Sequence, residues 1–455
     1  MKQIFLLVAF AISIASLAHA ADRPPNIVLI FADDLGYNDV SFNGRKEWST
    51  PNLDRLAKEG TVFRRFYTAA VVCAPSRAAL MTGKYSIHTG ACGNSDQLSA
   101  GEQTVAEALK ARGYATGLFG KWHLGSKEGQ HPLDQGFDEF FGFLGAKHAW
   151  EKFPNELVDG REMKPSEGHA DTLFTDRGLD FIDRKKDQPF FLCLPYVASH
   201  ARVEAPAEEI QKHKGKVPER NASKPLNATY AAEITQLDEE VGRVMAKLRE
   251  LKLDQNTLVI FTSDHGATFE VLAQGTAYDL DSNFPFRGQK RTLWEGGIRV
   301  PAVAWFPGKV KANVESHTPT HMTDLFPTFL SAAGAAADES TQVDGQDQFD
   351  VWTGNATAPQ RTLFWEWRTA DNIQTAAMRG DLKLVATGTN KAELFDVVKD
   401  PAERRSCAAT EKEAFQQLQK ELNAWLETEL PASKEKIAAS LERQSAATTA
   451  PGPGE

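Results

Sequence analysis

The chain has 455 residues, of which 42% are hydrophobic, with 51 Lys and Arg against 61 Asp and Glu. A net charge of −10 without a long basic run argues against a nucleic-acid partner, because binding to phosphate backbones depends on clustered Lys and Arg. An anionic substrate is not excluded, since the field in a cleft can differ from that of the whole molecule. Single domains usually stop growing near about 250–300 residues, so we expect one large domain and a smaller one.

The N-terminus has the pattern of a secretory signal. Lys2 precedes an apolar run over 4–17, and Ala18-His19-Ala20 is a small-x-small cleavage site. The run is too short and wrongly flanked for a membrane anchor. We therefore expect residues 1–20 to be removed from an exported protein without stable membrane insertion. It would be periplasmic or secreted, or lysosomal or secretory in a eukaryote.

Two predicted strands end in acidic residues. The apolar run 26–32 leads to Asp33 and Asp34, and the run 257–262 is followed by Asp264. Continuous apolar runs are typical of strands buried in a parallel sheet, whose carboxyl ends meet at one edge. Three carboxylates there repel one another unless a cation lies between them, and their oxygens suit Ca²⁺ or Mg²⁺. Aspartates that merely cap loops after strands are the alternative.

A cysteine precedes the helix predicted from Pro75 to Met81. Proline suits the first helical position, so Cys73 is expected at or just before the helix N-terminus, where free N–H groups favour an anion. Arg77 lies on the same helical face and adds an anion-binding guanidinium. The stretch indicates a reactive centre, with a buried structural cysteine as the alternative.

Three other segments contribute basic side chains. One segment follows the predicted strand 114–119, and another follows the predicted strand 190–197. The third is 284–301, which is rich in Gly, Arg and Lys and which we expect to be an ordered loop. The candidate residues are Lys121, His123, His200 and Lys290. Taken alone, Lys121 and His123 are weak evidence for a site, because an exposed Lys and a packed His are the default interpretation.

Alternating strands and helices over 26–335 predict a large, doubly wound, mostly parallel α/β sheet flanked by helices. The helices are expected at 51–59, 104–112 and 230–251. Beyond a polar segment, a small antiparallel sheet with one helix over 413–426 is predicted, its strands at 362–368, 376–378, 383–386 and 393–397. The expected domains are a catalytic α/β domain over 21–350, a C-terminal α+β subdomain over 351–432 and a disordered tail over 433–455.

The stretch Cys73-Ala74-Pro75-Ser76-Arg77, with Thr82-Gly83, resembles the signature of the type I sulfatases, which are formylglycine-dependent and belong to the alkaline phosphatase superfamily. Other segments resemble arylsulfatase-like blocks in family order: 26–34, 120–125, 263–266, 295–301, 394–396 and 400–401. The resemblance covers about residues 25 to 405. It implies a sulfuric ester hydrolase that converts a sulfate monoester to an alcohol and inorganic sulfate.

The resemblance also implies how the reaction proceeds. A maturation enzyme would oxidise Cys73 to formylglycine, one hydroxyl of whose hydrate attacks sulfur, while deprotonation of the other expels sulfate. One Ca²⁺ per chain, less readily Mg²⁺, would be held by metal ligands at Asp33, Asp34, Cys73, Asp264 and His265. Arg77 would hold the nucleophile and sulfate, Lys121 and Lys290 would bind sulfate oxygens, His123 would be the base and His200 the acid.

Some points stay open. Many family members have Asn at the position of His265, and imidazole is a softer ligand than a carbonyl oxygen, so direct coordination by His265 is undecided. Pairing among Cys92, Cys193 and Cys407 is undecided as well. The expected substrate is a sulfated carbohydrate or an aryl sulfate, with candidate sugar-reading loops at 147–150, Arg202 and 279–287. The sugar, the sulfated position and endo or exo action are not specified. A phosphomonoester or phosphonate hydrolase and an inactive glycan-binding homologue are the alternatives.

Overall fold

The computed structural model describes residues 23–146, 150–219, 226–268, 280–336, 342–369, 372–388, 392–429 and 434–435. The signal sequence expected over 1–20 lies outside the described residues. So do residues 147–149 and 279 of the candidate sugar-reading loops, and the tail expected over 433–455 apart from 434–435. Within the described ranges, no helix is both long and apolar enough to cross a bilayer.

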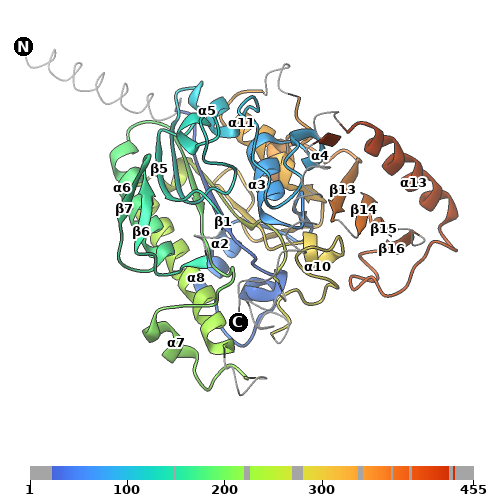
Figure 1. The fold of residues 1–455 in the computed structure, drawn as a ribbon, viewed down its shortest axis with the longest axis horizontal. Helices are drawn as coiled ribbons and strands as arrows, with labels where there is room; N and C mark the ends of the chain where they lie inside the picture. The colour runs from blue at the N-terminus through green and yellow to red at the C-terminus, as the bar shows by residue number, and fades with distance from the viewer. Residues whose placement is uncertain are drawn as a thin grey trace, which may run out of the picture.

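A ten-stranded sheet runs through the large domain (Figure 1), with strand order β11-β2-β10-β9-β1-β8-β4-β5-β6-β7. The strands are β1 Asn26–Ala32, β2 Thr61–Phe63, β4 Ala115–Lys121, β5 Glu139–Phe143, β6 Glu156–Asp159, β7 Glu162–Pro165, β8 Phe190–Pro195, β9 Thr257–Ser263, β10 Val303–Trp305 and β11 Val314–Ser316. The five central strands, β9 to β5 in that order, pair in parallel. The mostly parallel sheet is thus confirmed.

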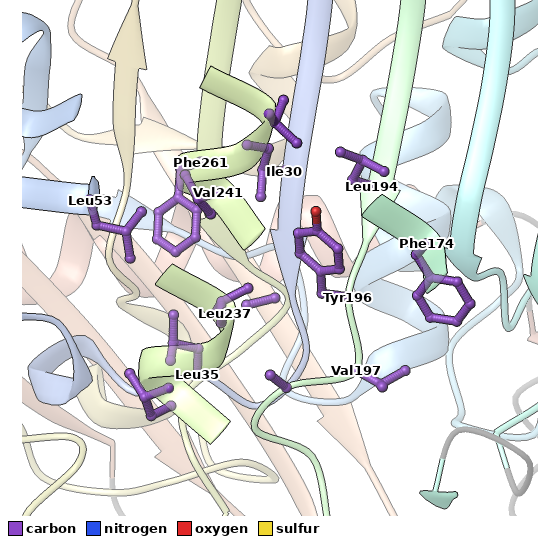
Figure 2. Close-up of a cluster of buried hydrophobic side chains, with 14 of the residues drawn as sticks. Ile30, Leu35, Leu53, Phe174, Leu194, Tyr196, Val197, Leu237, Val241 and Phe261 are labelled. Carbon is purple, nitrogen blue, oxygen red and sulfur yellow. The ribbon is translucent and has the colours of Figure 1, made fainter. Parts of the chain in front are cut away.

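Helices cover both faces of this sheet, because successive side chains of a buried strand point to opposite sides. Val28 and Ile30 of β1 share a core with α2, α6 and α8, and Figure 2 shows Ile30 and Phe261 against Leu237 and Val241 of α8. The bounds are α2 Pro51–Glu59, α6 Ala170–Lys185 and α8 Asn227–Glu250.

The opposite face of the sheet has a second core. Ile27 and Leu29 of β1 pack there with side chains of α3, α5 and α11. The bounds are α3 Cys73–Thr82, α5 Val105–Lys110 and α11 Leu325–Ala332. The doubly wound architecture is therefore confirmed. The shorter elements are α4 Ser86–Thr89, α7 Ala207–His213, α10 Glu295–Ile298, α12 Phe349–Thr353, β3 Phe66–Tyr67 and β12 Thr320–His321.

The C-terminal part forms a separate four-stranded antiparallel sheet with one helix, as predicted (right side of Figure 1). Its elements are β13 Thr362–Arg368, β14 Ile373–Arg379, β15 Leu382–Thr387, β16 Glu393–Asp396 and α13 Lys412–Glu427. One sheet face packs on Leu418, Leu422 and Trp425 of α13. The other packs on the large domain, where Trp365 and Val385 meet apolar residues next to α3 and α10.

One hairpin was not predicted. β6 and β7 extend the sheet edge beyond β5, and all four residues of β7 are exposed. Because neither strand carries a continuous apolar run, the hydrophobic pattern contains no signal for them.

Candidate active site

The predicted carboxylates meet at one edge of the sheet. β1 and β9 pair in parallel with Ala32 opposite Ser263, so Asp33 and Asp264 leave adjacent strands at the same level. The Asp264 N–H donates to Ala32 O (3.1 Å), and the Asp34 N–H donates to Asp264 Oδ1 (3.1 Å). Asp34 has φ +63°, which turns the chain sharply after the strand. These bonds fix the three carboxylates within one buried cluster.

Cys73 is the first residue of α3 and points into this cluster. Its Sγ lies 3.4 Å from Asp33 Oδ1, 3.4 Å from His265 Nε2 and 3.8 Å from Lys290 Nζ. Cys73 is thus at the helix N-terminus, as expected, but the position predicted for Pro75 was wrong, because it is the third helical residue and not the first. The first-turn N–H groups have no intrahelical partners, so proline costs no hydrogen bond at that position either.

Three cations pair with the three carboxylates, and all six side chains are at least nine-tenths buried. The closest approaches are 3.2 Å for Arg77 Nη2 to Asp264 Oδ2, 2.5 Å for Lys121 Nζ to Asp33 Oδ2 and 2.9 Å for Lys290 Nζ to Asp34 Oδ1. Arg77 Nη1 also donates to Lys121 O at 2.7 Å, which ties α3 to the end of β4. The structure therefore brings Lys290, from a loop distant in sequence, to the same site.

Two of the predicted histidines face this cluster. His123, with φ +62°, is buried, and burial lowers the pKa of its imidazole although a hydrogen bond with Cys73 opposes the fall. Its Nδ1 has no hydrogen-bond partner in the described part of the chain. A ring nitrogen of His200 lies within 4.8 Å of ligand atoms of Asp33, Asp34 and Cys73. His200 Nδ1 bonds to Ala201 O, so Nε2 is the nitrogen available to a substrate.

His265 is placed between two carboxylates. Its Nε2 lies 3.3 Å from Asp34 Oδ1 and 3.4 Å from Asp264 Oδ1. Burial alone would lower the pKa of His265, but Asp264, Asp34 and Cys73 outweigh it and raise the pKa to about 9. Near pH 7 the imidazole is therefore protonated in the absence of a metal, and it must lose a proton before Nε2 could coordinate a cation held by these carboxylates.

The electrostatics of the cluster favour a bound cation. Burial and the adjacent Asp33 raise the pKa of Asp264 well above its usual range. Burial would also raise the pKa of Cys73, but Lys121, Lys290 and His265 hold it well below its usual value. Ligand atoms of Asp33, Cys73, Asp264 and His265 all lie within 4.8 Å of one another. Within these groups, the oxygens of Asp33, Asp34 and Asp264 are the ligands that suit Ca²⁺ or Mg²⁺.

A cavity of about 510 Å³ opens beside His123. It lies between the loop that follows α4, the ends of β4 and β5, and the unpredicted β6–β7 hairpin. Its lining includes Asn94, Gln97, Ser126, Leu144, Glu156 and Met163. Ligand pockets of about 300–1,000 Å³ are typical of small-molecule sites, so this cavity has the size for one or two sugar rings.

Two site residues have roles that the sequence analysis did not assign. Ser76 Oγ donates to the carbonyl of Asp264 at 2.5 Å, and Asn94 Oδ1 accepts from the Ala74 N–H at 3.3 Å. Ser76 lies within the motif, but Asn94 is in a polar loop without any local signal. In the candidate loop 279–287, Arg287 is stacked on Trp294, with its guanidinium carbon 3.8 Å from the ring centroid.

The C-terminal sheet holds the segment that follows Lys290. Gln374 of β14 accepts from the Leu293 N–H (3.0 Å) and donates to Arg291 O (3.3 Å). Further along, the Glu295 side chain lies 2.9 Å from Lys383 Nζ of β15. The position of Lys290 thus depends on contacts between the C-terminal sheet and the segment 291–295.

Comparisons with known proteins agree with this architecture. A family model described as "Sulfatase" matches residues 25–335, and one described as "N-sulphoglucosamine sulphohydrolase, C-terminal" matches residues 287–431. N-acetylgalactosamine-6-sulfatase of Mus musculus is 36% identical over 378 residues, covering 76% of this chain and 69% of the relative. Arylsulfatase A of Homo sapiens is 34% identical over 437 residues, covering 87% and 81%.

Solved structures share the fold. The crystal structure of Ps i-CgsB has a TM-score of 0.82 at 28% identity, covering 94% of this chain and 99% of that chain. Fold and matches together define the class of protein, a sulfuric ester hydrolase. The chain belongs to the sulfatase family.

Proposed function

We propose that this sulfatase removes sulfate from a sulfated carbohydrate, releasing a sugar hydroxyl and inorganic sulfate. The observation that carries the proposal is the convergence of three buried cations and three carboxylates around Cys73. The carbohydrate class is supported by the cavity beside His123 and by two relatives. One relative is named N-acetylgalactosamine-6-sulfatase, and Ps i-CgsB, 27% identical in this comparison, was solved in complex with k-i-k-neocarrahexaose.

Cys73 is the residue proposed to be oxidised to formylglycine, whose hydrate supplies hydroxyl groups in place of the thiol. Asp33, Asp34 and Asp264, with His265 beside them, would hold a Ca²⁺ ion, which supplies positive charge that acidifies such a hydroxyl. The pKa of Asp264 is raised by burial and by the adjacent Asp33, and this supports the fit, because a bound cation relieves the repulsion between the two carboxylates.

The basic side chains have complementary roles in this proposal. Arg77, Lys121 and Lys290 bind sulfate oxygens and stabilise the negative charge that develops as the ester bond breaks. All three are rigidly placed by contacts within the cluster, so little reorganisation is needed at the moment of reaction.

The two histidines move protons. Burial lowers the pKa of His123, so its imidazole is neutral near pH 7 and can accept a proton from a hydroxyl group on residue 73. His200 protonates the leaving sugar oxygen through Nε2, because Nδ1 is committed to Ala201 O. A poor leaving group such as a sugar alkoxide needs this proton more than a phenolate does.

The substrate class is tested by parallel assays on one phenol esterified with sulfate or phosphate, and on defined sulfated mono- and disaccharides scored by free sulfate. We expect faster turnover of the sulfate ester and release of sulfate from at least one saccharide. Faster phosphate turnover would replace the proposal with a phosphomonoester hydrolase. Saccharide binding without sulfate release, by protein carrying formylglycine, would support the inactive glycan-binding alternative.

The modification of Cys73 is tested by mass spectrometry of the tryptic peptide that ends at Arg77. Conversion of the thiol to the aldehyde lowers the peptide mass by about 18 Da. A fully active preparation with an intact thiol would contradict the assignment.

Export is proposed from the N-terminal pattern. Sequencing of the mature N-terminus after expression with the complete leader should begin at Ala21. Retention of Met1 in an active, cell-associated protein would contradict removal of the leader.

A further inference from the structure

Three ionisable side chains are buried together behind the loop that carries His200. Asp171 is at the start of α6, Glu233 is in α8 and Lys152 precedes β6, and each is at most 1% exposed. None belongs to the sequence motifs, and none is within the catalytic cluster. Burial raises the pKa of Glu233 to about 8, so its carboxyl is mostly neutral near pH 7. Burial of ionisable groups is costly unless each is paired or hydrogen-bonded, so the contacts of these three side chains indicate their function.

The contacts converge on two consecutive peptide units of the loop. Asp171 Oδ1 accepts from the Val197 N–H at 2.8 Å, and Oδ2 accepts from the Ala198 N–H at 3.0 Å. Lys152 Nζ donates to the Val197 carbonyl and lies 3.4 Å from Glu233 Oε1. One carboxylate and one ammonium thus form hydrogen bonds with three backbone groups. Such charge-assisted hydrogen bonds are roughly twice as strong as hydrogen bonds between neutral groups.

The opposite side of the same loop is bonded to the site. The Asp33 N–H donates to Ala198 O at 3.0 Å, and the Ser199 N–H donates to Asp33 O at 2.8 Å. Ser199 Oγ also donates to Asp34 O at 3.2 Å. The loop is therefore held between the buried ionic group on one side and the backbone of the two strand-end aspartates on the other.

We propose that Asp171 and Lys152 are positioning residues for the sulfatase reaction, which fix the 197–199 backbone and through it Asp33 and His200. Glu233 orients Lys152. The inference rests on the proposed roles of Asp33 as a metal ligand and His200 as an acid. Apolar side chains of similar size would fill the space between α6, α8 and the loop, but they would leave the Val197 and Ala198 backbone groups unbonded.

The test is Asp171→Asn, which keeps the size of the side chain but turns one acceptor into an N–H₂ group facing a backbone N–H. We expect metal affinity, measured by calorimetry with Ca²⁺ alone, to fall about 10–100-fold, the range found for groups that orient metal ligands. kcat should fall over a similar range with little change in KM. The loss should be larger on a sugar sulfate than on a nitrophenyl sulfate, because only the poor leaving group depends strongly on His200.

The chain offers a matched control in Asp238→Asn. Asp238 is a buried α8 carboxylate that also accepts from two consecutive backbone N–H groups, those of Asn52 (3.1 Å) and Leu53 (2.7 Å), at the start of α2, and in addition from Asn52 Nδ2 (2.9 Å). It therefore matches Asp171 in local geometry without touching the 197–199 loop. We expect a comparable fall in melting temperature, with Ca²⁺ affinity, kcat and leaving-group dependence unchanged.

Unchanged Ca²⁺ affinity and leaving-group dependence in Asp171→Asn would overturn the proposal, as would equal changes in Asp238→Asn. If Asp171→Asn does not fold, the positioning role is tested with Lys152→Met, which removes the donor to Val197 O and should also lower Ca²⁺ affinity. If the wild type binds Ca²⁺ but releases no sulfate, the proposed function fails, while the calorimetric comparison still decides the positioning role.

Discussion

The function inferred for Cys73 differs between its local sequence and its surroundings in the structure. As a thiol at a helix start beside Arg77, it has the features of a cysteine nucleophile. In the structure it lies 3.4 Å from Asp33 Oδ1 within a carboxylate cluster that suits a hard cation. Thiolates are soft ligands and Ca²⁺ prefers oxygen, which is consistent with replacement of sulfur by oxygen at this position.

We predict that Cys73→Ala and Cys73→Ser each lower kcat/KM by at least about 10³-fold, as is typical when a nucleophile is lost. Alanine lacks any nucleophile, and serine would form a sulfate ester without a second hydroxyl to expel it. Assays with an aryl sulfate, at equal folded fractions by circular dichroism, check this. Multiple turnovers by Cys73→Ser would contradict it.

We predict acid sensitivity from His169, a buried residue at the start of α6. Burial and the nearby Lys152 lower its pKa from 6.5 to about 4, despite Glu240. The unfolded chain therefore binds more protons between these values, and stability present above pH 6.5 is lost as pH falls toward 4. The full loss is about 3 kcal/mol.

Urea unfolding between pH 7 and pH 4 measures this loss. His169→Gln, which cannot titrate, should show a shallower decline in the free energy of unfolding over that window. Parallel curves for the two proteins would show that His169 is not the group responsible.

Among the helices and strands, the bounds were predictable where a proline, an aspartate or a glycine stands at the end of the element. The apolar run over 26–32 lies between Pro25 and Asp33, and β1 spans these same residues, Asn26–Ala32. The α2 helix also has its predicted bounds, from Pro51 to the residue before Gly60. The polar β6–β7 hairpin lacks a continuous apolar run and was missed. The α5 helix begins after its Thr104 cap but ends at Lys110, two residues before the predicted last residue, although Gly113 follows.

The site residues were predictable for a different reason. Asp33, Cys73 and Lys121 stand in short motifs at strand ends or a helix start, so local pattern and family resemblance both point to them. Asp171 and Lys152 have no such motif, because their role depends on a loop that returns from another part of the chain. Interactions of this kind follow from tertiary structure and not from local pattern.

We predict that Gln374 of β14 helps to hold Lys290 in place. Gln374→Ala removes two hydrogen bonds to the segment after Lys290, each worth about 0.5–1.5 kcal/mol. We expect kcat to fall by up to about tenfold, since a looser segment holds Lys290 less well. Thr375→Ala, on the opposite face of the strand, is the control and should leave kcat unchanged. Equal kcat values for both variants would contradict the prediction.

At the scale of the molecule, we predict that Ca²⁺ stabilises the fold. Ligand at 100 times its Kd adds about 2.7 kcal/mol if it binds only the folded state. Thermal unfolding with Ca²⁺, Mg²⁺ or chelator should therefore give the highest melting temperature with Ca²⁺. Asp264→Asn should reduce the shift. An identical melting temperature in all three conditions would contradict a structural role for the ion.

The burial of Cys73 has a consequence for the time course of protein synthesis. In the finished fold only 1% of this residue is exposed, so the oxidation proposed for Cys73 requires that the enzyme reach it before the site closes. Closure needs β9 and Lys290, which are translated roughly two hundred residues later. At about 5–20 residues per second, that interval lasts about 10–40 s. On the proposed mechanism, Cys73 is therefore accessible to the oxidising enzyme mainly during this interval, and protein that folds first would keep the thiol.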